Sequence, residues 1–280
     1  MQRQISLAVF VQVVYLSSLP AVDAALSCWE RGIFGGEVFF LANVCYDVGN
    51  QFERKISMKR TKLSDRQLPD YTRGEEIMNM ITHIVGGVMG LTALTLCVIR
   101  AAIHGNVYGI VTSAIYGAAM VAMFTISSVY HGLRPNMGKK VMQVIDHCTI
   151  YFLIAGTYTV IVLSAFRPHY PVLAWGMFAF EWGMAALATT LTAIDLKKYN
   201  VFSMICYIGM GWAIVPFMKQ ALEVLTMPGF LLLLFGGIAY TIGSILYGLG
   251  KKRKWMHSVF HLFVNLGALL QFLAVLLYAV

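Results

Sequence analysis

The segment 251–280 reads KKRKWMHSVFHLFVNLGALLQFLAVLLYAV and decides the fold class. Four cationic residues open it, and from His257 onward it is almost wholly apolar over a length that can cross a bilayer about 30 Å thick as a helix. His257 and His261 lie four residues apart at the basic end, so a helix stacks them on one face, where both can bind one metal ion. The alternative is a pair of interfacial histidines without a ligand.

The composition of the whole chain is that of an integral membrane protein. Of 280 residues, 59% are hydrophobic and 12% are charged, whereas soluble domains are about 25% charged. The net charge of +8 does not indicate nucleic-acid binding, because the cations lie in short loops between apolar spans. The five cysteines include no C-x-x-C pair, so neither a disulfide framework nor a thiolate zinc site is predicted.

Seven apolar stretches follow a basic segment at 58–79 and predict an all-α, multi-pass, seven-transmembrane helix bundle over 80–280. Pro216 is expected to kink or loosen the fifth span, because it cannot donate a backbone hydrogen bond. The expected spans are Met80–Ile103, Tyr108–His131, Val141–Phe166, Pro171–Ile194, Val201–Leu222, Gly229–Leu249 and His257–Val280.

Loop charges set the expected orientation of these spans. From Met58 onward, fourteen Lys and Arg residues lie on one side of the predicted bundle and three lie on the other. Because cytoplasmic loops carry the excess of Lys and Arg, the N-terminus of the first span is expected in the cytoplasm and Val280 outside.

The first residues resemble a secretory signal peptide over 1–24, with Arg3, an apolar stretch and a cleavage-like Val22-Asp23-Ala24. A cleaved signal would export the segment that follows, which conflicts with a cytoplasmic start of the first span. We therefore expect residues 1–57 to be an unassigned N-terminal extension. It either lies outside a native chain that begins at Met58, or it forms an uncleaved, loosely associated tail.

Five of the seven histidines fall at the cytoplasmic ends of the predicted spans, and three of them form a plausible ligand set: His131, His257 and His261. Three protein ligands plus one water are typical of a catalytic zinc site. Zinc lowers the pKa of its water to about 7, so hydroxide becomes available at neutral pH.

Other polar side chains reach the same level. Asp146 is placed to act as general base toward the zinc-bound water, and Ser127 shares a helix face with His131 and can hydrogen-bond the water or an oxyanion. The candidates for orienting the metal ligands form one stripe on the first span, namely Glu76, Asn79 and His83. The alternative is a polar seam that packs the helices and holds no metal.

Two further polar residues stay outside this expected set. His147 is adjacent to Asp146 but about 100° around the helix, so it does not point the same way. Glu181 lies midway along the fourth span and is either a cavity liner or a protonated or paired buried carboxyl group.

Four motifs occur in order along the chain: Glu76-x-x-Asn79-x-x-Thr82-His83, Ser127-x-x-x-His131, Asp146-His147 followed by Ile154-Ala155-Gly156-Thr157-Tyr158-Thr159, and His257-x-x-x-His261. Together they resemble the bacterial hemolysin III branch of the progestin and adipoQ receptor family, from about Thr72 to the C-terminus. Val160 follows Thr159 where many members have Pro, a difference that concerns helix shape rather than chemistry.

The resemblance implies seven helices with the N-terminus inside, and zinc held by His131, His257 and His261. In the wider superfamily, which includes alkaline ceramidases, a Ser and an Asp flank a zinc-bound water. These two positions correspond to Ser127 and Asp146.

Three functions follow as hypotheses for a multi-pass protein of the plasma membrane whose partner is a membrane lipid or a lipid-like ligand. The first is a zinc-dependent intramembrane hydrolase acting on a ceramide-like lipid amide. The second is a pore-forming cytolysin, after the name of the branch. The third is a receptor or sensor in which zinc only ties the second and seventh spans together.

Overall fold

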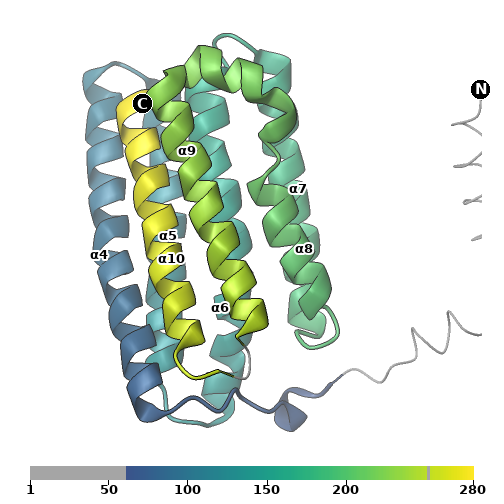
Figure 1. Ribbon diagram of the computed structural model, residues 1–280. Coiled ribbons are helices and arrows are strands. Elements are labelled where there is room, and N and C mark those ends of the chain that lie inside the picture. The colour runs from purple at the N-terminus through teal and green to yellow at the C-terminus, as the bar shows by residue number, and fades with distance from the viewer. Residues whose placement is uncertain (1–60, 251–252) are drawn as a thin grey trace, which may run out of the picture. The chain divides into compact units, whose positions relative to one another are not determined.

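All regular structure in the described residues, 61–250 and 253–280 of the computed structural model, is helical (Figure 1), which confirms the predicted all-α class. The predictions for residues 1–57 lie outside this part of the chain. The helices are η1 (Leu63–Asp65), α4 (Arg73–Ile103), α5 (Val107–Gly132), α6 (Met137–Val160), η2 (Ile161–Phe166), α7 (Pro171–Ile194), α8 (Asn200–Gly211), η3 (Val215–Phe217), α9 (Met218–Leu249), α10 (Met256–Ala274) and η4 (Val275–Ala279).

Helix α4 begins at Arg73, earlier than the span expected from Met80. Thr72 caps it: the Thr72 hydroxyl accepts from the backbone N–H of Glu75 at 3.3 Å, and the Glu75 carboxylate accepts from the Thr72 backbone N–H at 2.9 Å. Acidic residues in the first turn also suit the positive end of the helix dipole. The polar residues Glu76 and Asn79 are therefore fixed on a helix.

The chain between α8 and α9 is broken where Pro216 predicts a break. The fifth span, expected to continue to Leu222, ends as a regular helix at Gly211, and Pro216 lies in η3. Helix α9 starts across one end of the bundle in Figure 1 and is broken again at Thr226, which has φ 59°. The Tyr158 hydroxyl accepts from the Ile214 N–H at 3.0 Å and donates to the Gly211 carbonyl at 3.1 Å, which satisfies two backbone groups freed by the break.

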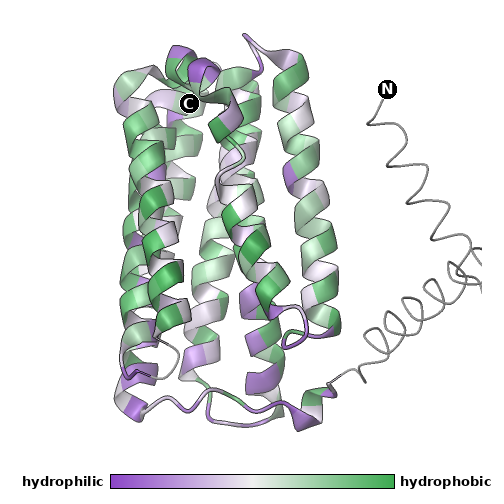
Figure 2. Ribbon diagram, turned by 45° about the vertical axis from the view of Figure 1, so that its right-hand side comes forward, coloured by the Kyte–Doolittle hydropathy of each residue, from purple (hydrophilic) through white to green (hydrophobic). Residues whose placement is uncertain are grey.

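Within the described part of the chain, six helical stretches are long and apolar enough to cross a membrane, and their exposed side chains suit a lipid environment. The fifth stretch, Asn200–Leu249, has 50 residues and contains both α8 and α9. Val85 and Val88 on α4 are 61% and 60% exposed. Figure 2 shows hydrophobic residues along the length of the helices, as expected where lipid tails replace water.

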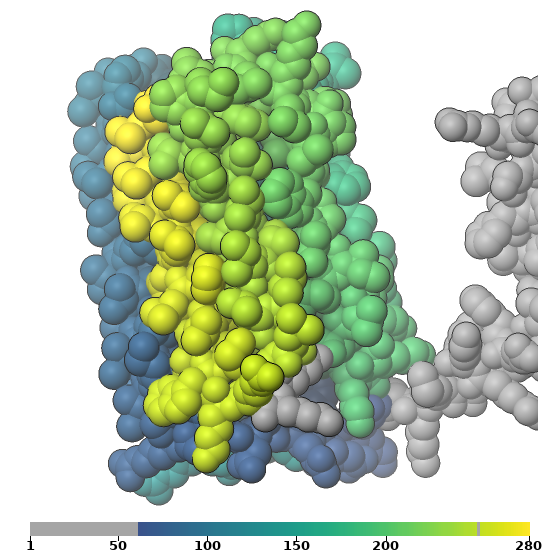
Figure 3. All heavy atoms as spheres, in the orientation of Figure 1, coloured from purple at the N-terminus to yellow at the C-terminus, as the bar shows by residue number. Residues whose placement is uncertain are grey.

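Helix α10 lies between α4 and α9 on the face shown in Figure 3. Two glycines of α4 allow α4 and α5 to approach closely. A Cβ at Gly86 would lie 2.3 Å from Phe124, and one at Gly90 would lie 3.1 Å from the Val121 backbone. Nothing lies within 4 Å of a Cβ at Gly248 on α9, so this glycine makes no such close approach.

Candidate metal centre

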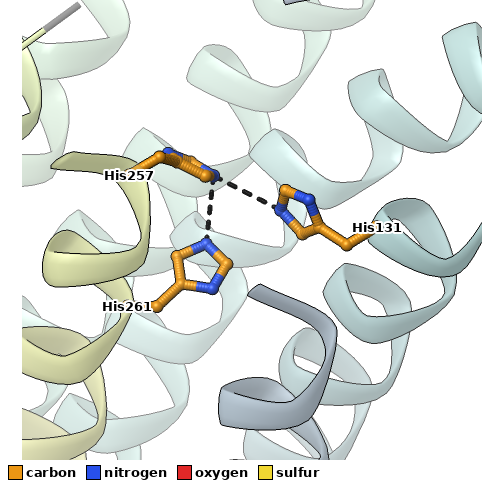
Figure 4. Close-up of side chains that lie close together, drawn as sticks. All are labelled: His131, His257 and His261. Carbon is orange, nitrogen blue, oxygen red and sulfur yellow. Dashed lines mark hydrogen bonds between the residues drawn. The ribbon is translucent and has the colours of Figure 1, made fainter. Parts of the chain in front are cut away.

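Three imidazole rings converge at the end of the bundle where α5 finishes and α10 starts (Figure 4). His131 lies in the last turn of α5, and His257 and His261 lie in the first turns of α10. The Nε2 atom of His257 is 3.3 Å from that of His131 and 3.0 Å from that of His261. His131 and His261 are each 2% exposed. The structure thus brings together the three residues predicted as metal ligands.

Glu76 orients His131. Its Oε2 atom lies 2.7 Å from His131 Nδ1, across the contact between α4 and α5. Because a carboxylate oxygen accepts, Nδ1 carries the proton and Nε2 presents a lone pair to the centre. Glu76 therefore has the position predicted for a residue that orients a metal ligand.

His261 is oriented by α4 in the same manner. Its Nδ1 atom lies 3.3 Å from both the Asn79 carbonyl oxygen and the Thr82 hydroxyl. The Thr82 hydroxyl donates to backbone carbonyls of its own helix, so it accepts from His261. The Asn79 side chain accepts from Ser258 on α10 at 2.6 Å, which holds the two helices in register at this point.

His257 is held by stacking rather than by a hydrogen bond at Nδ1, which has no partner within the described residues. The Tyr71 ring stacks on it, with centroids 5.0 Å apart and 15° between the planes. Tyr71 lies in the segment Thr61–Thr72, which precedes α4. Burial raises the pKa of the Tyr71 hydroxyl above its usual range, so the ring stays neutral.

The donor set fits a zinc ion. Tetrahedral ligands at about 2.0–2.1 Å from zinc lie about 3.3 Å from one another. His257 Nε2 is 3.3 and 3.0 Å from the Nε2 atoms of the other two histidines, and the ligand atoms of all three residues lie within 4.8 Å of one another. Because His131 and His261 carry their protons on Nδ1, the Nε2 atoms of both present lone pairs to His257 Nε2. A single N–H on His257 can donate a good hydrogen bond to only one of these two nitrogens. A cation satisfies all three nitrogens, and the cluster could therefore hold a metal ion.

Asp146 and Ser127 lie beside the histidines. The Asp146 carboxylate lies 3.8 Å from His147 Nδ1 and lines the same cavity as Ser127, His257 and His261. Ser127 is 2% exposed and lies one helical turn before His131 on α5. Their predicted catalytic roles are not tested by this geometry and remain predictions.

A cavity of about 360 Å³ extends from this group of residues into the bundle. Asp146, Ser127, His257 and His261 line one part of it. Elsewhere the walls are mainly apolar side chains of α6, α9 and α10, among them Leu153, Phe230, Leu233, Leu234 and Val264. An apolar cavity with a few polar groups at one place is typical of a site for a lipid-like ligand.

The remaining predicted polar residues take other positions. His83 stacks on His261 with centroids 3.7 Å apart, and its nitrogens have no hydrogen-bond partner among the described residues, so it does not orient a ligand through a hydrogen bond. His147 Nδ1 lies 2.8 Å from the Gln143 carbonyl, outside the histidine cluster. Glu181 is fully buried on α7, and it does not line the cavity.

Two residues near the centre were not singled out from the sequence. Lys139 entered the topology prediction only as a loop cation, yet its Nζ lies 2.6 Å from Glu76 Oε1. Tyr71 sits in a polar segment without periodicity, and no sequence signal identifies its stacking on His257. The position of Lys139, eight residues after His131, is a signal that could have placed it near the same helix ends.

Comparison with known proteins gives consistent matches over most of the chain. The profile of a family described as haemolysin-III related matches residues 71–272. Hemolysin-3 of Bacillus cereus is 36% identical over 73% of this chain and 91% of its own length. A Hemolysin-3 homolog of Bacillus subtilis (strain 168) is 34% identical over 75% of this chain and 97% of its own length. The human Monocyte to macrophage differentiation factor is 27% identical over 81% of this chain and 92% of its own length. No solved structure matches the chain significantly.

Proposed function

This chain belongs to the haemolysin-III related family, and from that premise we propose that it is a zinc-dependent intramembrane hydrolase of a ceramide-like lipid amide. The membership agrees with the resemblance expected from the motifs, and the human relative is consistent with the wider progestin and adipoQ receptor family. One observation supports the proposal above others. Three oriented histidines, Asp146 and Ser127 meet where an apolar cavity begins.

His131, His257 and His261 would hold the metal. Zinc, when bound, supplies a water of lowered pKa and polarises a carbonyl group. Asp146 would take the proton from the attacking water and pass it to the leaving amine as the amide C–N bond breaks. The Ser127 hydroxyl would donate to the oxygen that becomes negative in the tetrahedral transition state.

The apolar walls would bind the acyl chain and place the amide at the polar end of the cavity. Burying an apolar chain contributes about 0.8 kcal/mol per CH₂ group relative to water. A lipid chain has already gained that contribution in the bilayer and enters the cavity at little cost, whereas a small polar amide would lose its water and find few hydrogen-bond partners on the apolar walls. Ceramide-like lipids combine such chains with a hydrolysable amide.

The test is fatty-acid release from labelled lipid amides by the full chain reconstituted in liposomes. Wild type with zinc should release fatty acid, and chelation should stop it. Asp146→Asn should lower the rate by roughly 10²- to 10⁴-fold while zinc stays bound, because only proton transfer is lost. Absence of zinc-dependent release, or an unchanged rate in Asp146→Asn, contradicts the proposal.

The names of two relatives favour a second candidate, a pore-forming cytolysin. The cavity argues against it, since its walls are mainly apolar beyond the histidine end. Dye release from liposomes that is unaffected by His261→Ala would support the pore. Zinc that stabilises the fold without turnover of any lipid would support a receptor or sensor.

We also propose seven membrane crossings in the plasma membrane, with the start of α4 in the cytoplasm and Val280 outside. A 50-residue helix would be about 75 Å long, more than twice the bilayer core, which supports separate crossings for α8 and α9. Alkaline phosphatase fused after Val280 should then be active in bacterial cells. The same enzyme fused after Lys140 should be inactive, and the opposite pattern would reverse the topology.

A further inference from the structure

Lys139 is a buried lysine beside the predicted metal centre. It lies in the first turn of α6 and is 2% exposed. Its Nζ donates to Glu76 Oε1 at 2.6 Å and to the Leu133 carbonyl at 2.9 Å, and it lies 5.2 Å from the centre of the Tyr130 ring. Lysine is almost never fully buried unless it is paired.

The position of Lys139 is unfavourable for α6 itself. A cation in the first turn faces the positive end of the helix dipole, and the cap of α6 is made by the Asn136 side chain, which accepts from the Lys139 backbone N–H at 2.8 Å. The Lys139 side chain is therefore not needed to start the helix. Its partners lie on other parts of the chain, and the principal one is Glu76.

Glu76 uses one carboxylate oxygen for each partner. Oε1 accepts from Lys139 and Oε2 accepts from His131 Nδ1 at 2.7 Å. The two bonds fix the rotation of the carboxylate, and the lysine ammonium compensates its charge. A row of Lys139, Glu76 and His131 then ends at the Nε2 atom that faces the other two histidines.

We propose that Lys139 is a positioning residue of the metal centre, which acts through Glu76 to fix the orientation and donor strength of His131. The inference rests on the proposed zinc site and goes beyond it, because it assigns part of the metal affinity to a residue that touches no ligand directly. Partners that hold a ligand histidine typically change metal affinity 10- to 100-fold when they are removed.

A simpler role would be a structural tie between α4 and α6. Loss of a tie would lower the thermal stability of the metal-free protein but would leave the zinc affinity of the folded protein near that of wild type. A positioning role predicts that removing Lys139 lowers zinc affinity. This loss should not add to the loss caused by Glu76→Gln, since Lys139 acts on His131 only through the Glu76 carboxylate.

The experiment measures zinc affinity of the purified full chain in detergent by competition with a chromophoric chelator. Lys139→Met should lower the affinity roughly 10- to 100-fold, and Lys139→Arg should retain more of it because it keeps the charge. Lys140→Met is the matched control with wild-type affinity, because Lys140 donates instead to the Ser64 carbonyl. The double variant Glu76→Gln/Lys139→Met should be no weaker than Glu76→Gln alone.

Thermal unfolding of the metal-free variants separates misfolding from a local effect. If Lys139→Met alone does not fold, the double variant can still be compared with Glu76→Gln. It removes both charges of the buried pair together, which destabilises a protein less than leaving one charge unpaired. Affinity of Lys139→Met within twofold of wild type, or additive losses in the double variant, would overturn the inference. Wild type that binds no zinc would instead remove the proposed function, and the inference with it.

Discussion

The region of α4, α5 and α10 differs from α8 in how closely its backbones approach. A Cβ at Gly86 would lie 2.3 Å from Phe124, and one at Gly117 would lie 2.5 Å from Leu94. On α8, a Cβ would meet nothing within 4 Å either at Gly211, which lines the cavity, or at Gly209, which is exposed. The first region carries the three histidines, and the second forms part of the cavity wall. The histidines that could hold a metal ion therefore lie on closely packed helices, as a precise site requires, and the cavity lies where packing is open.

The largest effect should come from the closely packed region, at the centre itself. His261→Ala removes one of the three nitrogens and should reduce bound zinc from roughly one per chain to near zero. Elemental analysis of purified protein measures this directly. His147→Ala is the control, since its Nδ1 atom faces the Gln143 carbonyl. Equal zinc in wild type and His261→Ala would show that the cluster is not the metal site.

The packing difference itself is tested with two glycines. Gly86→Ala should destabilise the protein by about 1–3 kcal/mol, because the added methyl group forces the Phe124 ring to move. Gly209→Ala should be neutral or stabilise by up to about 1 kcal/mol, because α8 gains a better helix former in open space. Thermal unfolding in detergent compares them, and equal shifts would contradict the difference in packing.

A smaller effect is expected at the break between α8 and α9. Tyr158→Phe removes the hydroxyl that bonds Gly211 and Ile214, and should lower stability by about 1 kcal/mol. Zinc content should not change, because the broken segment contributes no metal ligand. A loss of zinc in this variant would show that the two regions are coupled.

The smallest effect is a pH dependence at the loop between α7 and α8. Burial acts to raise the pKa of Asp195, but backbone N–H groups of Thr61, Lys197 and Lys198 outweigh it and lower the pKa. Because the folded pKa lies below the unfolded value of about 3.9, the stabilisation is full above that pH and is lost as pH falls through the folded pKa.

Asp195→Asn measures that contribution, which is on the order of 1 kcal/mol at pH 7. The difference in unfolding temperature between this variant and wild type should shrink below pH 4. A difference that grows on acidification would contradict the assignment.

The helices and the meeting of the three histidines could be predicted from the sequence, because both follow from local spacing and from the membrane. A long apolar stretch forms a helix in a bilayer, because its backbone N–H and C=O groups must hydrogen-bond to one another there. The charges of the loops predicted that His131 lies at the same membrane level as His257 and His261. Pro216 likewise indicated a break through its missing N–H.

Other features depend on tertiary contacts that leave no local pattern. Lys139 looks like any loop cation, and only the fold shows that it is buried against Glu76. His83 shares a stripe with Glu76 and Asn79, yet it stacks on His261 instead of bonding to it.

The separation of the ligands along the chain has a consequence for the order of synthesis. His131 and His257 are 126 residues apart, and at about 5–20 residues per second the ribosome needs roughly 6 to 25 s to make the second after the first. The centre cannot exist during that interval. Glu76 precedes His131 in the chain, and Lys139 follows it by only eight residues. Both are therefore available to hold the His131 ring in place before the last helix is made and brings His257 and His261 to it.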